Sequence, residues 1–203
     1  MSEPPSADYQ SKRREILQQA ARIFAEHDSA DVSLDRLSVA MGKSHNYHCR
    51  YFPTKAELVY ALLDTHLTAL LEAAGEAEAL AGPGRARLDA MAFACLDHIL
   101  GEGADAQRIF TLVLRRVTRE QRQDVRTKLR WLAALFADAL AEALPGLAAR
   151  PELAAPLTRS LFAMLGGAPQ WFRTDGALSG AQYARLAVSC TLEGARAELQ
   201  LPR

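Results

Sequence analysis

The spacing of apolar residues predicts a chain built from helices. Between Lys12 and Glu26, apolar residues recur three and four positions apart, as on one face of an amphipathic helix: Ile16, Leu17, Ala20, Ile23 and Phe24. A second apolar face over 34–41 follows a potential capping residue, Ser33, and precedes a potential helix stop, Gly42. No stretch shows the strict alternation of apolar and polar residues that is typical of a half-buried strand.

The sequence beyond Lys55 continues the helical pattern. Glycines, prolines and Ser/Thr-x-x-Glu/Gln capping boxes, which begin at Thr54, Thr118 and Ser179, mark the ends of successive Ala- and Leu-rich segments. We therefore expect helices over about 55–80, 83–100, 106–117, 118–144, 151–173 and 179–199. Together with three helices upstream of Lys55, the prediction is an all-α fold of about nine helices.

The polar segment over 42–55, GKSHNYHCRYFPTK, reads as a turn, a short helix and the start of a longer helix. Gly42 can adopt a positive φ, and Ser44 can cap the short helix that follows. Pro53 ends that helix, because the residue before a proline is pushed out of the α region. A short polar helix between such boundaries is how a helix-turn-helix protein presents its recognition helix to the DNA major groove.

The stretch from Arg14 to Leu63, about a quarter of the chain, resembles the N-terminal domain of the TetR family of transcriptional regulators. The most specific match is the run Tyr51-Phe52-Pro53-Thr54-Lys55, followed by Leu58. The other matching positions lie on the first two helices and in the turn: Ile16, Leu17, Ala20, Phe24, Ala25, Ser33, Leu34, Leu37, Ala40, Gly42 and Ser44.

This resemblance implies a homodimer that binds a palindromic operator in double-stranded DNA, acts as a repressor and is released by a small-molecule effector. The implied organisation is a mobile leader over 1–8, a helix-turn-helix domain over 9–54 and a helical effector-binding and dimerisation domain over 55–203. No cofactor is implied.

Several positions depart from the usual pattern of the family. Asp28 stands where glycine is usual, and Asp tolerates the left-handed conformation better than most residues. In the recognition helix, Asn46, Tyr47, His48 and Cys49 replace the common succession of glycine, threonine, leucine and tyrosine. His48 must find a buried partner or turn outward, and Cys49 cannot make the phosphate contact of the usual tyrosine. The alternative is therefore a TetR-like fold without specific DNA binding, acting as a ligand-binding or protein-interaction module.

The recognition segment nevertheless offers donors suited to DNA. Asn46 can pair with adenine through two hydrogen bonds, and Arg50 can reach guanine or a phosphate. Tyr47 suits a base edge or a sugar, and His45 a phosphate or a guanine acceptor. We expect backbone contacts from the remaining polar residues: Ser33, Lys43, Ser44 and Lys55. From Lys12 to Lys55, eight basic and five acidic residues give a net charge of +3, which is modest for a nucleic-acid binder.

Composition agrees with a cytoplasmic regulator. The chain has 203 residues, 49% of them hydrophobic, and no net charge. Its three cysteines form no disulfide pattern, and no apolar run is long enough for a signal peptide or a membrane span. Catalytic motifs are missing, so we expect no enzyme. His45, His48 and Cys49 share one helical turn, but we expect no metal there without further ligands nearby.

The last two predicted helices are the candidates for dimerisation. Their apolar positions are Leu153, Leu157, Leu161, Met164 and Leu165 on the first, and Tyr183, Leu186, Cys190, Leu192 and Ala197 on the second. Packing within one chain is the alternative, but so short a chain offers little other core to cover two such faces.

An effector pocket is expected among the middle helices, where aromatic and apolar residues accompany a few polar groups. The candidates are Phe93, His98, Phe110, Trp131, Leu135, Phe162 and Trp171, although aromatic residues at helical spacing more often belong to a core.

A basic run from Arg108 to Arg130 sets eight Lys and Arg residues against Glu120 and Asp124 alone. A charged stripe is most often a solvated helix face. The alternative is a site for an anionic effector or for an acidic protein surface.

Overall fold

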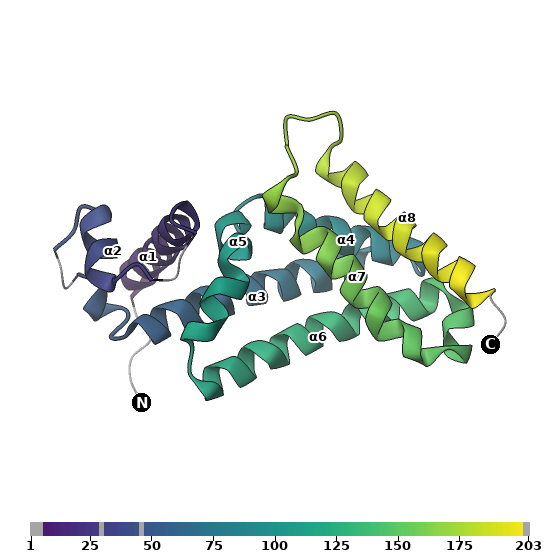
Figure 1. The fold of residues 1–203 in the computed structure, drawn as a ribbon, viewed down its shortest axis with the longest axis horizontal. Coiled ribbons are helices and arrows are strands. Elements are labelled where there is room, and N and C mark those ends of the chain that lie inside the picture. The colour runs from purple at the N-terminus through teal and green to yellow at the C-terminus, as the bar shows by residue number, and fades with distance from the viewer. Residues whose placement is uncertain (1–5, 29–30, 45–46, 201–203) are drawn as a thin grey trace.

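The computed structural model describes residues 6–28, 31–44 and 47–200, and these form an elongated all-helical molecule (Figure 1). Eight α-helices run through the described residues: α1 (Ala7–Glu26), α2 (Leu34–Ala40), α3 (Lys55–Leu80), α4 (Arg85–Leu100), α5 (Ala104–Val113), α6 (Arg119–Ala143), α7 (Ala154–Gly166) and α8 (Gly180–Leu199). Short 3-10 helices lie between them: η1 (Tyr47–Arg50), η2 (Leu114–Arg116), η3 (Pro145–Ala149), η4 (Pro151–Leu153) and η5 (Ala168–Gln170). None of these helices is both long and apolar enough to cross a bilayer.

The all-α prediction is confirmed, with eight α-helices in the described residues in place of about nine. The difference lies in the expected recognition helix, whose described part is the 3-10 helix η1. The backbone N–H groups of Tyr51 and Phe52 both donate to the carbonyl of His48, and Pro53 follows at once. An α-helix therefore has no room to continue.

Two other helix boundaries differ from the prediction. Helix α1 begins at Ala7, where the Ser6 side chain accepts a hydrogen bond from the backbone N–H of Tyr9, so residues 6–8 form its cap and first turn. The helix expected over 151–173 is interrupted on both sides: η4 precedes α7, and Gly167 and Pro169 close it. The remaining leader residues, 1–5, lie outside the described part of the chain.

The capping boxes expected from the sequence are all formed. In each, the Ser or Thr side chain accepts from a backbone N–H three residues on, and a Glu or Gln side chain accepts from the backbone of the cap. The pairs are Thr54 with Glu57, Thr118 with Gln121, and Ser179 with Gln182. Each satisfies two N–H groups that a helix end leaves without partners.

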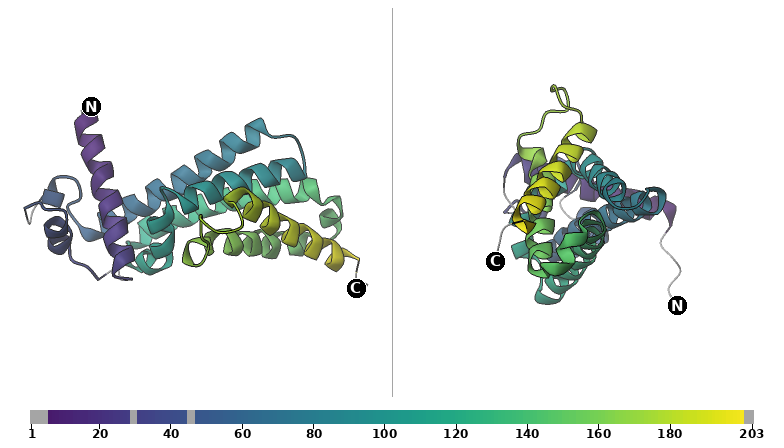
Figure 2. Two further views of the ribbon diagram at one scale, coloured as in Figure 1. Left: turned by 90° about the horizontal axis from the view of Figure 1, so that it is seen from above. Right: turned by 90° about the vertical axis from the view of Figure 1, so that its right-hand side faces the viewer.

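Helix α3 joins the two parts of the molecule. Helices α1 and α2 lie with η1 at one end, α1 stands across α3, and α3 continues into a bundle with α4, α6, α7 and α8 (Figure 2). Helix α1 also packs on α5, so the N-terminal unit contacts the rest of the molecule at two helices, α3 and α5. The fully buried Phe24 of α1, Leu63 of α3 and Phe136 of α6 belong to one continuous apolar core.

Gly42 supplies a conformation that other residues adopt only with strain. Its φ is +67°, and an added Cβ would meet no atom within 4 Å. We expect Gly42→Ala to lower the free energy of unfolding by about 1 kcal/mol through backbone strain alone. Gly75→Ala, in the open interior of α3, should instead raise it by about 0.5–1 kcal/mol. Urea denaturation of the two variants checks both signs, and equal effects would contradict this account.

Candidate functional site

The turn between α2 and η1 is fixed by a series of backbone hydrogen bonds. The N–H of Gly42 donates to Val39 at 2.9 Å, and that of Lys43 donates to Ser38 at 2.9 Å. Beyond the turn, the N–H of Tyr47 donates to the carbonyl of Ser44, also at 2.9 Å, which begins η1. The polar segment is therefore held in one orientation on α2.

His48 has a buried partner, which resolves the two alternatives left open by the sequence. Its side chain is buried, and its Nδ1 lies 2.8 Å from the Oγ of Ser38, a fully buried residue of α2. The Sγ of the exposed Cys49 lies 3.4 Å from its Nε2. His48 thus takes the packing role of the usual leucine, with a hydrogen bond in place of purely apolar contact.

Aromatic contacts bind η1 to the first turn of α1. The ring centroid of Tyr51 lies 4.9 Å from that of Tyr9 and 5.7 Å from that of Tyr47. The Tyr9 hydroxyl donates to the carbonyl of Arg50 at 3.4 Å. The Nζ of Lys43 lies 5.3 Å above the Tyr47 ring, within range of a cation–π interaction. These contacts place the cation of Lys43 beside the exposed backbone of the turn.

Lys55, the first residue of α3, is partly withdrawn from solvent. Its Nζ lies 5.8 Å from the centroid of Phe24. Burial lowers the pKa of this ammonium group, and the nearby Arg116 lowers it further. Arg116 of η2 forms an ion pair with Asp31, which joins the bundle to the loop before α2.

The structure brings most of the predicted DNA-contacting residues to one end of the molecule, on α2, the turn, η1 and the start of α3 (Figure 1). Ser33, Lys43, Ser44 and Arg50 are exposed there, whereas Tyr47 and Lys55 are half-buried. The Ser33 side chain caps α2 by accepting from the N–H of Arg36, so this hydroxyl already has a partner. His45 and Asn46 lie outside the described residues.

The bundle contains an apolar cavity of about 150 Å³. Its walls come from α3, α4, α5, α6 and α7: Leu67, Leu70, Cys95, Ile99, Gln107, Phe110, Leu129, Leu132, Phe162, Leu165 and Gly166. Burial raises the pKa of the Cys95 thiol to about 12, so this wall stays uncharged. Among the described residues of the lining, Gln107 carries the only amide side chain, and both ends of that amide already hydrogen-bond within the protein.

A chain of hydrogen bonds runs from Gln107 across the bundle. The Nε2 of His66 lies 2.8 Å from the Oε1 of Gln107, and its Nδ1 lies 3.1 Å from the Nε2 of His98. The amide of Gln107 donates to the carbonyl of Gly166 at 3.1 Å. Burial lowers the pKa of His66 to about 4, so the ring is neutral near pH 7. Burial also lowers the pKa of His98.

The end of this chain lies beside α1. His66 and His98 line a second hollow of about 160 Å³, whose other wall includes Arg14, Leu17 and Gln18 of α1. The polar chain therefore connects the apolar cavity to the contact between the N-terminal unit and the bundle.

The predicted effector residues are only partly brought to the cavity. Phe110 and Phe162 line it, and Leu135 is half-buried against the core without lining it. His98 reaches it only through His66 and Gln107. Gln107 lines the cavity, although it was not among the predicted effector residues. Its one signal in the sequence is a polar side chain directly after Ala106, which is buried.

Three predicted effector residues lie on the surface instead. Trp131 is 57% exposed because α6 turns its neighbour Leu132 inward, and Phe93 is 42% exposed on α4. Trp171 follows η5 and is 59% exposed, with one ring edge against Phe172 and Tyr183. Helical spacing does not distinguish these positions from the buried face.

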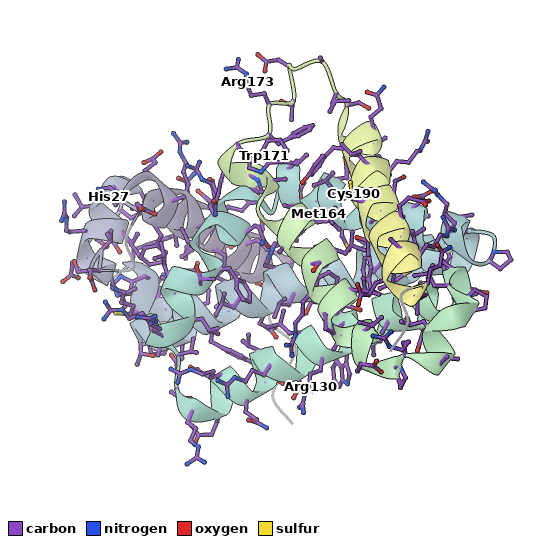
Figure 3. All side chains as sticks on the ribbon, turned by 45° about the vertical axis from the view of Figure 1, so that its right-hand side comes forward. His27, Arg130, Met164, Trp171, Arg173 and Cys190 are labelled. Atoms are coloured by element: carbon purple, nitrogen blue, oxygen red, sulfur yellow. The ribbon has the colours of Figure 1, made fainter. Side chains whose placement is uncertain are left out.

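The candidate dimerisation helices α7 and α8 lie side by side on one face of the bundle (Figure 3). Part of their expected apolar stripe packs within the chain itself, since Leu161, Leu165, Tyr183 and Leu192 are buried. The exposed remainder is smaller: Leu186, which is 48% exposed, with Cys190 and Ala197 on the same side of α8.

The basic run from Arg108 to Arg130 does not form one stripe, because η2 and a loop separate α5 from α6. Arg122 donates to the carbonyls of Leu114, Arg115 and Val117 and so closes the end of that turn. Lys128 pairs with Asp64 of α3. Arg126 and Arg130 remain exposed on α6. Among the described residues, no group of three His, Cys, Asp or Glu side chains could hold a metal ion.

Solved structures share this fold. A TetR-family transcriptional regulator from Bordetella parapertussis 12822 is 26% identical, with a TM-score of 0.82 over 94% of this chain and 98% of that one. The ketosteroid transcriptional regulator KstR2 of Mycobacterium tuberculosis is 20% identical, with a TM-score of 0.75 over 90% and 94%. AibR, solved in complex with isovaleryl coenzyme A and operator DNA, is 19% identical, with a TM-score of 0.71 over 87% and 96%.

A search among curated proteins gave no match. The family model for the tetracyclin repressor-like C-terminal domain matches residues 81–195, which is more than half of the chain. The chain therefore belongs to the TetR family of transcriptional regulators.

Proposed function

We propose that this regulator is a cytoplasmic homodimer that represses transcription by binding a palindromic operator and leaves the DNA when a small molecule occupies the bundle. Within that role, the turn and η1 contact the operator, and the 150 Å³ cavity receives the effector. The residues proposed to contact DNA are Ser33, Lys43, Ser44, His45, Asn46, Tyr47, Arg50 and Lys55.

The observation that carries the proposal is the course of α3. Its capped first turn directly follows η1, and farther along Leu67 and Leu70 line the cavity. One rigid helix therefore touches both candidate sites, and a shift at the cavity moves the end that holds η1. Such a two-site connection is what ligand-controlled DNA binding requires.

AibR supports this combination of ligand and DNA, because it has been solved with isovaleryl coenzyme A and operator DNA together. At 19% identity, AibR shares the fold with this chain. The effector of this chain is therefore argued from the residues of this chain.

The exposed part of α8 supports dimerisation. Leu186 and Cys190 present an apolar side that no other described segment covers, and Trp171 lies near the start of the same helix (Figure 3). Packing of α7 and α8 against the same helices of a second copy buries this surface and sets the distance between the two η1 elements.

Selection from random duplex DNA at two salt concentrations tests the proposal. We expect enrichment of one palindromic site, with affinity falling steeply as salt rises, because phosphate contacts release counterions. Tyr47→Ala should lose the enrichment. Failure of the folded, ligand-free protein to enrich any sequence at low salt would contradict the proposal.

Two arginine variants separate specific contact from general charge. Arg50→Ala should weaken binding to the selected site by about 1–3 kcal/mol, or about fivefold to 150-fold. Arg173→Ala removes the same charge from an exposed position in the loop between η5 and α8, which Figure 3 shows away from the N-terminal unit, and should leave the affinity nearly unchanged. Equal losses in anisotropy titrations would show that only net charge matters.

The alternative of a DNA-free module rests on Cys49, which is exposed where the family commonly has a phosphate-contacting tyrosine. His48 no longer favours this alternative, because its ring packs beneath η1. The same selection decides between the two functions.

A further inference from the structure

A basic groove of about 600 Å³ lies between α6 and α7. Gln123, Arg126, Arg130 and Ala133 follow one face of α6, while Arg159 faces them from α7. Figure 3 shows the Arg130 side chain extending outward from α6. No acidic residue is among the described residues that line the groove, so its three guanidinium groups share a site without a neutralising carboxylate.

The groove and the apolar cavity share two walls. Leu129 of α6 and Phe162 of α7 line both spaces, so the basic groove and the apolar cavity adjoin at these two side chains. Both are half-buried, and neither belongs to a hydrogen-bonded network. Phe162 is also held by an edge-to-face contact with the buried Phe136, with ring centroids 5.0 Å apart, so a rotamer change of Leu129 is the simpler way to join the two spaces.

These arginines differ from the other cations of the basic run. Arg116, Arg122 and Lys128 are committed to protein carboxylates or carbonyls. Arg130 makes one neutral contact, to the hydroxyl of Thr127. Arg126 and Arg159, from two different helices, are left facing a common space, as expected for recognition of an anion rather than for a solvated helix face.

We propose that the effector is an anionic amphiphile: a short acyl chain that enters the cavity between Leu129 and Phe162, with a carboxylate or phosphate head on Arg126, Arg130 and Arg159. This inference rests on the proposed function, because it names the ligand class of the same cavity. An apolar cavity of about 150 Å³ accommodates a molecule of roughly six carbon atoms, which limits the chain to about four to six carbons.

Calorimetric titration of the DNA-free full chain tests the proposal with four ligands: hexanoate, hexanoyl-coenzyme A, coenzyme A alone and hexanol. We expect one of the two acyl anions to bind at least tenfold more tightly than hexanol, which has the chain without the charge. It should also bind at least tenfold more tightly than coenzyme A, which has the charge without the chain. Which acyl anion binds identifies the head group as a free carboxylate or a phosphate-bearing thioester.

Variants on both sides of Leu129 locate the ligand. Arg126→Gln combined with Arg159→Gln should weaken the acyl anion about tenfold or more. Arg119→Gln, on the same helix but outside the groove, should change it less than twofold. Cys95→Met, which fills part of the cavity, should also weaken the acyl anion while leaving the dependence on Arg126 and Arg159 intact. Before the titrations, the thermal unfolding of each variant is compared with that of the unchanged chain to establish that the variant is folded.

Each other outcome overturns the inference. Equal affinity for hexanol and the acyl anions would remove the role of the arginines, and equal affinity for coenzyme A would remove the role of the cavity. Binding of neither acyl anion at millimolar concentration would exclude the ligand class. Operator selection is measured without ligand, so the two proposals can fail separately. A protein that selects an operator but binds neither acyl anion keeps the proposed role in DNA binding and loses this ligand class. A protein that binds an acyl anion but selects no operator loses only the proposed DNA binding.

Discussion

Phe52→Ala should lower the free energy of unfolding of the N-terminal unit by about 3–5 kcal/mol, which is the usual cost of removing a buried phenylalanine side chain. Phe52, two residues after the end of η1, is 2% exposed, and the guanidinium of Arg13 lies 4.9 Å from the centroid of its ring. Loss of this ring leaves a cavity beneath the proposed DNA-contacting surface. Urea denaturation measures the loss, and hydrogen exchange reports whether α1 and α2 open before the bundle.

Phe93→Ala is the matched control, because this phenylalanine is 42% exposed on α4. We expect it to cost less than about 1 kcal/mol and to leave operator affinity unchanged. Similar losses for the two variants, or full operator affinity in Phe52→Ala, would contradict the view that Phe52 supports η1.

Acidification should destabilise the protein by on the order of 3 kcal/mol through His66. The pKa of His66 is about 4 in the folded chain and 6.5 when unperturbed. Between these values the unfolded chain binds the proton first, so folded stability is highest above pH 6.5 and falls as the pH drops towards 4. His98, whose pKa is also lowered by burial, acts in the same direction.

His66→Gln removes the titration while keeping a donor and an acceptor for Gln107 and His98. Its free energy of unfolding should depend less on pH between 6.5 and 4 than that of the unchanged chain. His27→Gln, at an exposed position after α1, should keep the original dependence. The same slope in all three proteins would exclude His66 as its cause. Denaturant melts at half-unit pH steps provide the comparison.

Local signals were sufficient to predict most of the fold. The capping boxes at Thr54, Thr118 and Ser179 are formed, because a cap depends on residues three positions apart. Asp28, expected to accept a left-handed conformation, has a φ of +44°. The expected recognition helix changed type: its described part is the 3-10 helix η1, where the competition between a short helix and the following proline depends on packing against Ser38 and α2.

The candidate sites were predicted less completely, because their composition depends on contacts between distant segments. Trp131 and Phe110 look equivalent in an apolar pattern, yet one is largely exposed and the other lines the cavity. The groove forms because Arg159 of α7 lies opposite Arg126 of α6. No local sequence pattern indicates that these two distant residues come together. The basic run in the sequence includes both Arg126 and Arg122. The sequence could not show that the Arg122 guanidinium donates to the carbonyls of Leu114 and Val117, whereas Arg126 faces the groove.

The central claim is that two copies of this chain read one palindromic operator, and a titration of the selected duplex tests it most directly. Fluorescence anisotropy would compare that duplex with one in which a single half-site is scrambled, at two salt concentrations, while native mass spectrometry counts the protomers bound. We predict two protomers on the intact site and an affinity loss of at least tenfold on the half-site duplex, with a steep salt dependence for both. A single bound protomer, or equal affinity for the intact and scrambled duplexes, would contradict the account.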